Sequence, residues 1–112
     1  MLRGLGRIAS LAIVLALATG LVGCSQYGKL QAKRAFKDAN VLYAQQEYKR
    51  AAVLYEEAIA SDPELSVAYF YLANSYDNLF KPSRKGEPEN DAYLTKAIEF
   101  YTHNLGLRLS DR

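Results

Sequence analysis

Hydrophobic and polar residues alternate with the period of an α-helix in four segments between residues 32 and 101. Within each segment apolar side chains recur every three to four residues, which places them on one face of a helix. The four sets are Ala32, Ala35, Phe36, Ala39 and Leu42; Tyr48, Ala51, Ala52, Tyr55, Ala58 and Ile59; Leu65, Ala68, Tyr69, Leu72, Ala73 and Tyr76; and Leu94, Ala97, Ile98 and Tyr101. No stretch alternates with period two for long enough to form a strand. The pattern predicts an all-α fold.

Polar residues, Pro and Gly mark the expected connections between these helices. The polar run 45–47 predicts a short joint between the first two helices. Asp62 is a suitable cap for a helix that starts at Pro63, because the first helical position does not need an N–H donor. Ser61 and Glu64 also have the spacing of a capping box. The segment 80–91 predicts a charged loop between the last two helices.

Several residues repeat with a period of 34. The matching pairs are Ala35 and Tyr69, Ala39 and Ala73, Asn40 and Asn74, and Leu42 and Tyr76. This period, with the order of small and aromatic residues in "EYKRAAVLYEEAIASDP", resembles the tetratricopeptide repeat. The resemblance implies about two antiparallel helical hairpins, at 32–65 and 66–105, with the loop 80–91 inserted in the second and a tail at 106–112. It also implies that Ala39, Ala51 and Ala58 allow close helix approach around Tyr55. An unrelated antiparallel four-helix protein is the alternative.

The first 24 residues have the organisation of an export signal. Arg3 and Arg7 precede an uncharged apolar stretch, 8–22, which is shorter than the roughly 20 residues of a membrane span. The stretch ends in Leu21, Val22, Gly23 and Cys24, which resembles the lipobox of bacterial lipoproteins. The resemblance implies a cleaved signal peptide at 1–23, diacylglyceryl attachment to Cys24, and a tether at 24–31. An uncleaved anchor is the alternative.

Charge and cysteine content agree with this interpretation. Arg3 and Arg7 account for the whole net charge of +2, so residues 24–112 are electrically balanced and give no sign of nucleic-acid binding. Cys24 is the only cysteine, and no disulfide within the chain can explain it. Ser25 follows the cysteine, whereas an aspartate there resembles a signal for retention in the inner membrane. We therefore expect an exported lipoprotein, located in the outer membrane and facing the periplasm if the cell has two membranes.

Few residues have the pattern of a catalytic or metal site. His103 is the only histidine, so a metal site built from imidazoles is excluded. Glu87, Glu89 and Asp91 carry carboxylates in the predicted loop, but the ligand spacing and central glycine of a calcium loop are missing. Glu56 and Glu57 are adjacent and are expected on a solvated helix face. We expect no catalytic residue, no metal and no cofactor.

The tetratricopeptide resemblance implies a peptide-binding surface on the first helix of each hairpin. The corresponding residues are Lys33, Phe36, Asn40, Tyr43, Phe70, Asn74 and Asp77. Asn40 and Asn74 are candidates to hold a peptide backbone, with hydrogen bonding at the helix surface as the alternative. Phe36 and Tyr71 stand where a carboxylate-clamping member of the family needs polar groups, so such a clamp is not expected.

These observations together predict a non-catalytic, lipid-anchored envelope adaptor that binds another protein or a peptide. One alternative is the N-terminal fragment of a longer repeat lipoprotein, because "HNLGLRLSDR" does not resemble the end of a repeat. Another is an accessory or sensor subunit of a periplasmic enzyme or transport complex. The last helix carries more apolar residues than one packed face covers. A second copy, a partner or further residues are expected to cover it. The apolar residues concerned are Phe100, Tyr101, Leu105, Leu107 and Leu109.

Overall fold

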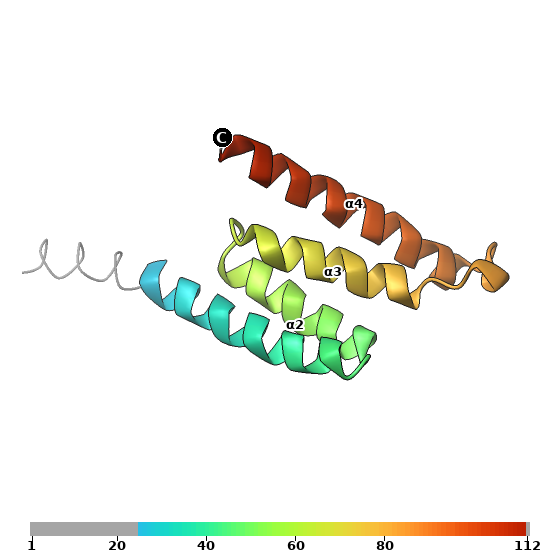
Figure 1. Cartoon of the computed structure of the whole chain (residues 1–112), viewed down its shortest axis with the longest axis horizontal. Helices are drawn as coiled ribbons and strands as arrows, with labels where there is room; N and C mark the ends of the chain where they lie inside the picture. Colours follow the sequence, from blue (N-terminus) through green and yellow to red (C-terminus); the bar gives the residue numbers. More distant parts are fainter. Residues whose placement is uncertain (1–24, 112) are drawn as a thin grey trace, which may run out of the picture.

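The computed structural model describes residues 25–111, and helices account for nearly all of this range (Figure 1). Residues 25–44 are helical and are called the first helix below. The next helices are α2 (Tyr48–Ser61), α3 (Ser66–Leu79) and α4 (Pro88–Ser110), with the short 3₁₀ turn η1 (Pro82–Arg84) between the last two. No strand occurs between residues 25 and 111. The predicted all-α fold of antiparallel hairpins is confirmed.

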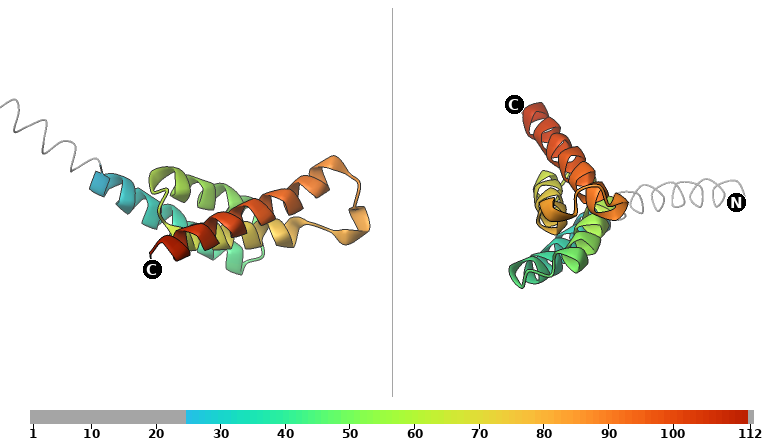
Figure 2. Two further views of the ribbon diagram at one scale, coloured as in Figure 1. Left: turned by 90° about the horizontal axis from the view of Figure 1, so that it is seen from above. Right: turned by 90° about the vertical axis from the view of Figure 1, so that its right-hand side faces the viewer.

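The helices follow one another as a row of antiparallel neighbours. The first helix and α2 form one hairpin, and α3 packs against both α2 and α4. Figure 1 and the right-hand view in Figure 2 place α4 and the first helix at opposite edges of the molecule. Any surface on the first helix is therefore distant from one on the outer side of α4.

Small residues form much of the core between the helices. The buried cluster consists of Ala39, Ala51, Ala52, Tyr55, Leu72, Tyr76 and Ala97. Ala39, Ala51 and Ala58 are fully buried, and Tyr55 fills the space that they leave. The role predicted for these alanines is confirmed. Gly28 lets the first helix approach the end of α2 closely, because a Cβ at this position would stand 3.0 Å from the backbone oxygen of Ser61.

The start of α3 differs from the prediction. The helix begins at Ser66, not at Pro63, and Leu65 occupies the capping position without a side-chain hydrogen bond. Asp62 Oδ1 accepts the N–H of Glu64 at 3.2 Å, so its carboxylate stabilises a turn and does not cap a helix. The Pro63 carbonyl accepts the Tyr69 hydroxyl at 2.9 Å, which fixes this turn against α3.

Within the predicted tether at 24–31, residues 25–31 are helical and continue into the first helix. Two contacts explain why this segment is ordered as helix. Gln31 donates to the Tyr27 hydroxyl one turn away, and Gly28 packs closely on the end of α2. The predicted signal peptide 1–23 and the motif from Leu21 to Cys24 lie outside the described residues.

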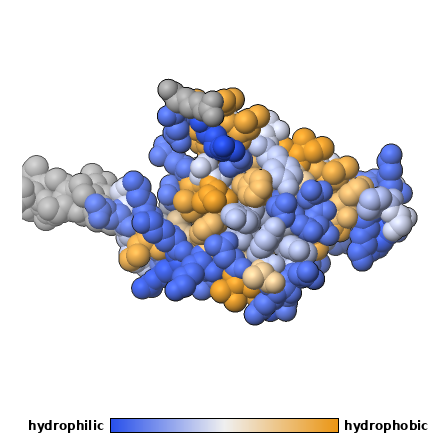
Figure 3. Space-filling model, viewed as in Figure 1, coloured by the Kyte–Doolittle hydropathy of each residue, from blue (hydrophilic) through white to orange (hydrophobic). Residues whose placement is uncertain are grey.

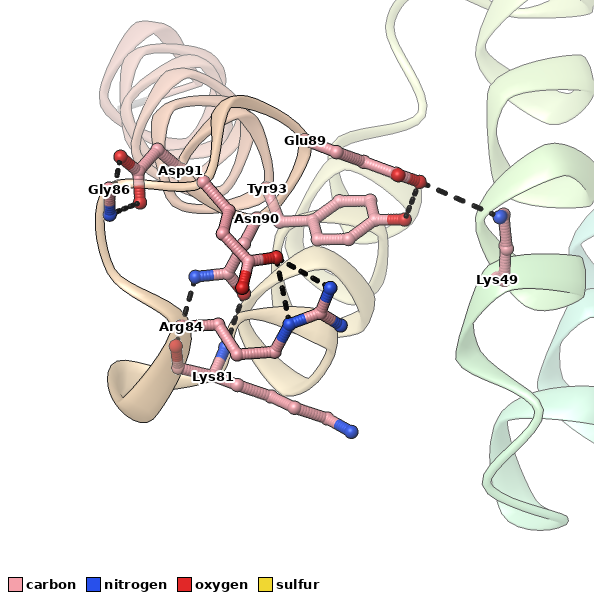
Figure 4. A network of polar contacts seen from close by, with 9 residues as sticks. Lys49, Lys81, Arg84, Gly86, Glu89, Asn90, Asp91 and Tyr93 are labelled. Atoms are coloured by element: carbon pink, nitrogen blue, oxygen red, sulfur yellow. Dashed lines mark hydrogen bonds and ion pairs between the residues drawn. The ribbon is translucent and has the colours of Figure 1, made fainter.

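The inserted segment is shorter than predicted, because 88–91 form the first turn of α4. Pro88 suits the first helical position, since it lacks only an N–H that would have no helical partner. The Asp91 carboxylate accepts the N–H of Gly86, which sits at φ +99°, a conformation that favours glycine. Figure 4 shows these contacts at the start of α4. Among residues 25–111, no helix has both the length and the apolar content needed to cross a bilayer.

Candidate binding surface

Six aromatic side chains from all four helices meet in what we call the aromatic cluster. Its members are Phe36 and Tyr43 of the first helix, Tyr55 of α2, Phe70 and Tyr71 of α3, and Tyr101 of α4. The ring centroids of Tyr43 and Tyr71 lie 5.3 Å apart, and those of Phe70 and Tyr71 also lie 5.3 Å apart. Edge-to-face contacts of this kind fix the relative positions of the helices. The cluster thus provides a rigid base for a surface formed by the first helix and α3.

Asn40 and Asn74, the two predicted peptide-binding amides, bridge different helices. Asn40 Oδ1 accepts the Tyr55 hydroxyl at 2.6 Å. The Tyr43 hydroxyl donates to Asn74 Oδ1, and Asn74 Nδ2 donates to the Tyr101 hydroxyl at 3.1 Å. Both asparagines therefore help to hold the cluster together.

The bonds of Asn74 limit what it can offer to a ligand. Its Oδ1 accepts hydrogen bonds from Tyr43 and from Asn78 Nδ2, which uses both oxygen lone pairs. Its Nδ2 has one further hydrogen besides the one directed at Tyr101. Within the described structure Asn74 can thus donate one hydrogen bond to a peptide carbonyl, but it lacks the paired donor and acceptor that we expected.

The other predicted surface residues differ in accessibility. Lys33, Phe70 and Asp77 are exposed, and Phe70 keeps 42% of its surface in solvent although its ring touches Tyr71 and Tyr101. Phe36 and Tyr43 are half-buried because their rings pack within the cluster. Phe70 is therefore the aromatic side chain of the predicted set that is most available to a ligand.

Besides the predicted core residue Tyr55, two cluster residues were absent from the predicted set of surface residues. Tyr71 follows Phe70 directly, and the sequence indicated only that it excludes a carboxylate clamp. Tyr101 had been assigned to packing, but its hydroxyl reaches Asn74 from α4. The repeat predicts that the last two helices form a hairpin, but it gives no sign that the Tyr101 hydroxyl reaches Asn74. Only the three-dimensional structure could identify these two residues.

The charge of the first helix is distinct from that of the rest of the chain. Residues 25–44 contain four Lys and Arg but one carboxylate, whereas residues 45–112 contain eight against eleven. Lys29 and Lys33 lie on the same helix face as Phe36 and Asn40, since their spacings are four, three and four residues. Both lysines are exposed, and the ion pairs of residues 25–111 involve none of the cations of the first helix. This face is accordingly basic.

Burial raises the pKa of two tyrosine hydroxyls of the cluster, those of Tyr43 and Tyr55. The pKa of Tyr55 is raised far above its ordinary value, first by burial and then by the neighbouring Tyr43 and Tyr71. The pKa of Tyr43 is raised by burial and by nearby tyrosines, Tyr48 foremost among them. Neutral hydroxyls remain hydrogen-bond donors, so the links to Asn40 and Asn74 persist throughout the physiological range.

The remaining candidate groups already have structural partners. His103 stacks on Tyr69 with ring centroids 4.1 Å apart. Glu56 is exposed as predicted, yet it also accepts the Tyr76 hydroxyl and so joins α2 to α3. Within 25–111 no three His, Cys, Asp or Glu side chains are grouped closely enough to hold a metal ion.

The carboxylates of the inserted segment are also engaged (Figure 4). Glu87 pairs with Arg84, which lowers the pKa of Glu87 through the hydrogen bond and the guanidinium charge. Glu89 lies 3.9 Å from Lys49 of α2 and accepts the Tyr93 hydroxyl at 3.1 Å. The carboxylates of Glu87, Glu89 and Asp91 therefore all have partners within the fold.

A hollow of about 290 Å³ lies on another part of the molecule, between α2, α3 and α4. Tyr76, Tyr93 and Val53 form part of its apolar lining. The Lys96 ammonium lies 5.0 Å from the centre of the Tyr76 ring, where it makes a cation–π contact. The lysines that line the hollow thus have partners within the fold, Lys96 on the Tyr76 ring and Lys49 at Glu89, in contrast to those of the basic face of the first helix.

No protein-family model, curated protein or solved structure matches this chain.

Proposed function

We propose that the protein is a non-catalytic, lipid-anchored envelope adaptor of the tetratricopeptide type. It binds a segment of another protein on the surface formed by the first helix and α3. The observation that carries this proposal is the aromatic cluster, in which Tyr71 contacts both the exposed Phe70 of α3 and Phe36 of the basic first helix. The 34-residue repeat and the antiparallel hairpins support the family assignment.

The ligand proposed for this surface is an acidic segment with at least one apolar side chain. Lys29 and Lys33 supply two cations on one face, and carboxylates on the partner would complement them. Phe70 supplies apolar area at the other side of the surface, on α3. Aromatic anchors of this kind contribute much of the affinity of protein interfaces. Asn74 contributes its one remaining amide hydrogen to a backbone carbonyl.

The anchor of the adaptor is a diacylglyceryl group on Cys24. The motif Leu21-Val22-Gly23-Cys24 supports this, and export followed by location in the outer membrane, facing the periplasm, is the localisation that we propose. Helical structure extends to residue 25, directly after the cysteine. The anchor therefore holds the first helix, and its basic face, close to the membrane.

Metabolic labelling with a radioactive fatty acid tests the anchor. The wild-type chain is expected to incorporate the label and to migrate as the cleaved form. Cys24→Ala removes the acceptor sulfur, so we expect no label and accumulation of the uncleaved precursor. Ser25→Ala is the matched control, and it is expected to retain the label. An unmodified Cys24 in the wild-type protein, found by mass spectrometry, would refute lipid attachment.

Selection from a random peptide display library tests the binding surface independently of the anchor. The full chain in detergent is the bait, and we expect enriched sequences to combine Asp or Glu with aromatic or aliphatic residues. Binding should weaken at higher ionic strength and in the charge-reversed variant Lys29→Glu/Lys33→Glu. The control Lys49→Glu/Lys96→Glu changes the charge equally at the distant hollow. Equal loss of binding in both variants would contradict the proposed surface.

A further inference from the structure

The outer side of α4 carries a row of apolar residues that nothing in residues 25–111 covers. Four members of the row are exposed, Leu94 at 38%, Ile98 at 60%, Leu105 at 55% and Leu109 at 57%. With Tyr101 they are spaced four, three, four and four residues apart, so they follow one face of the helix. Figure 3 shows apolar side chains along the edge of the molecule that α4 forms.

A different face of α4 makes the contact with α3. Asn90, Ala97 and Asn104 are the buried residues of the helix, and Asn104 Nδ2 donates to the Ser66 carbonyl at 2.6 Å. Asn104 stands where the repeat pattern has a small residue, and this bond to α3 explains the departure. The four exposed residues of the row are therefore additional to this face, whereas Tyr101 borders it, since it contacts Phe70 and Asn74 of α3. Continuous apolar surface of this kind marks an interaction site.

The order of the exposed residues is nearly the same in both directions along the helix. The midpoint between Leu94 and Leu109 in the sequence falls between Tyr101 and Thr102. The midpoint between Ile98 and Leu105 falls at the same place. In a two-fold dimer, residue i meets residue j while j meets i. An antiparallel pair of α4 helices would therefore place Leu94 against Leu109 of the other copy, and Ile98 against Leu105.

We propose that the protein forms a homodimer through antiparallel pairing of two α4 helices along this row. The charged ends of α4 support a second copy as the occupant. Glu89 and Asp91 lie in the first turn of the helix, and Arg108 lies in the last turn. Antiparallel pairing brings the acidic end of each helix near the basic end of the other. It also aligns the two helix dipoles favourably.

The proposed dimer leaves the basic face of the first helix accessible, whereas Phe70 of α3 lies beside its centre, because its ring contacts Tyr101. The first helix lies at the opposite edge of the molecule from α4, so a second copy on α4 does not cover it (Figure 2). The dimer would present two basic faces, one on each subunit. Such an arrangement allows bivalent binding of a partner that carries two acidic segments.

Cysteine cross-linking in the native membrane tests the register of the pair. Thr102→Cys places a thiol beside the two-fold axis, and we expect covalent dimers with a short bis-maleimide. Leu94→Cys places the two equivalent thiols about 22 Å apart, because 15 residues separate position 94 from position 109 at 1.5 Å each. This variant alone should not cross-link, whereas co-expression with Leu109→Cys should give a dimer. The wild-type chain, with Cys24 alone, sets the background.

Charge substitution in the full chain gives a second, independent measurement. Ile98→Glu inserts a carboxylate into the centre of the pair, and we expect loss of the dimer in sedimentation in detergent. Val53→Glu is the matched control, since Val53 of α2 is 55% exposed and lies outside the row.

Four results would overturn the proposal. A monomeric wild-type chain, together with no cross-linking of Thr102→Cys above background, would do so. Equal self-cross-linking of Leu94→Cys and Thr102→Cys would indicate parallel pairing. Loss of the dimer in Val53→Glu to the same extent as in Ile98→Glu would also contradict it. Cross-linked products containing a different protein in place of a second copy would show that α4 has another occupant.

Discussion

Asn90 and Lys81 exchange two hydrogen bonds, one in each direction. The Lys81 backbone N–H donates to Asn90 Oδ1 at 2.8 Å, and Asn90 Nδ2 donates to the Lys81 carbonyl at 2.9 Å. Asn90 is almost fully buried, with 4% of its surface exposed. One side chain in the first turn of α4 thus satisfies both backbone groups of a residue just after α3. This pair fixes where the inserted segment ends and how α4 is placed on α3.

Removal of this side chain should destabilise the fold. Asn90→Ala leaves the partly buried N–H and carbonyl of Lys81 without these partners, at a cost of about 1–3 kcal/mol for each group that water does not reach. We expect the urea midpoint of unfolding to fall by a corresponding amount. Asn78→Ala is the matched control, because Asn78 is exposed and water can replace its hydrogen bonds. Equal stability of the two variants would contradict the role assigned to Asn90.

Packing at Ala51 gives a second prediction. Ala51 is fully buried where α2 meets its neighbours, so the larger side chain in Ala51→Leu has no space. Overpacking of this kind typically costs about 1–3 kcal/mol. Ala60→Leu makes the same change at an exposed position of the same helix and should change stability little. Thermal unfolding monitored by circular dichroism compares the two. A lower melting temperature for Ala60→Leu than for Ala51→Leu would show that the packing is different.

Two helical glycines should respond oppositely to alanine. Alanine favours helix over glycine by about 1 kcal/mol, and nothing lies within 4 Å of a Cβ at Gly106. Gly106→Ala is therefore expected to stabilise the protein. At Gly28 a Cβ would stand 3.0 Å from the Ser61 backbone oxygen, and this contact opposes the gain. We expect Gly28→Ala to give no increase in the free energy of unfolding. An equal increase in both variants would exclude the close contact.

The buried tyrosines predict how stability depends on alkaline pH. Burial raises the pKa of Tyr76 far above its usual value, and the hydrogen bond to Glu56 raises it further. The pKa in the unfolded chain is about 10, so above that pH the folded state binds more protons. The stabilising contribution is complete below about pH 10 and is lost progressively as the pH rises further.

Tyr76→Phe removes this ionisable hydroxyl but retains the ring that stacks on Tyr93 and Phe100. The variant should therefore lose less stability than the wild-type chain between about pH 8 and about pH 11. Urea unfolding across this range is the measurement. Tyr48→Phe serves as a control, because it removes a tyrosine hydroxyl at a half-exposed position at the start of α2. An unchanged pH dependence in Tyr76→Phe would contradict the assigned effect of burial.

The hydrophobic period predicted the helices and their core because it is a property of one helix face. Ala39, Ala51 and Tyr55 all lie in the core where the pattern placed them. The starts of α3 and α4 were less predictable, since they depend on competition between local hydrogen bonds. The Asp62 carboxylate forms a hydrogen bond within a turn and does not cap a helix. The contact between Asn90 and Lys81 determines where α4 begins.

The candidate surface was predictable only in part. The repeat identified Phe70 and Lys33 as exposed positions, and both are exposed in the structure. It gave no means of recognising that Asn74 joins Tyr43 to Tyr101, because those bonds connect three helices distant in sequence. The basic face of the first helix was also hidden, because the balanced charge of residues 24–112 conceals its separation into a basic and an acidic part.

Site-specific photo-cross-linking in living cells tests most directly whether this surface binds another protein. A photoreactive amino acid replaces the exposed Phe70, or Val53 on α2 as the control position. We predict a discrete adduct with a different protein from position 70, absent from position 53 and lost in Lys29→Glu/Lys33→Glu. The same adducts from both positions, or an adduct from position 70 that survives the charge reversal, would contradict the proposed function.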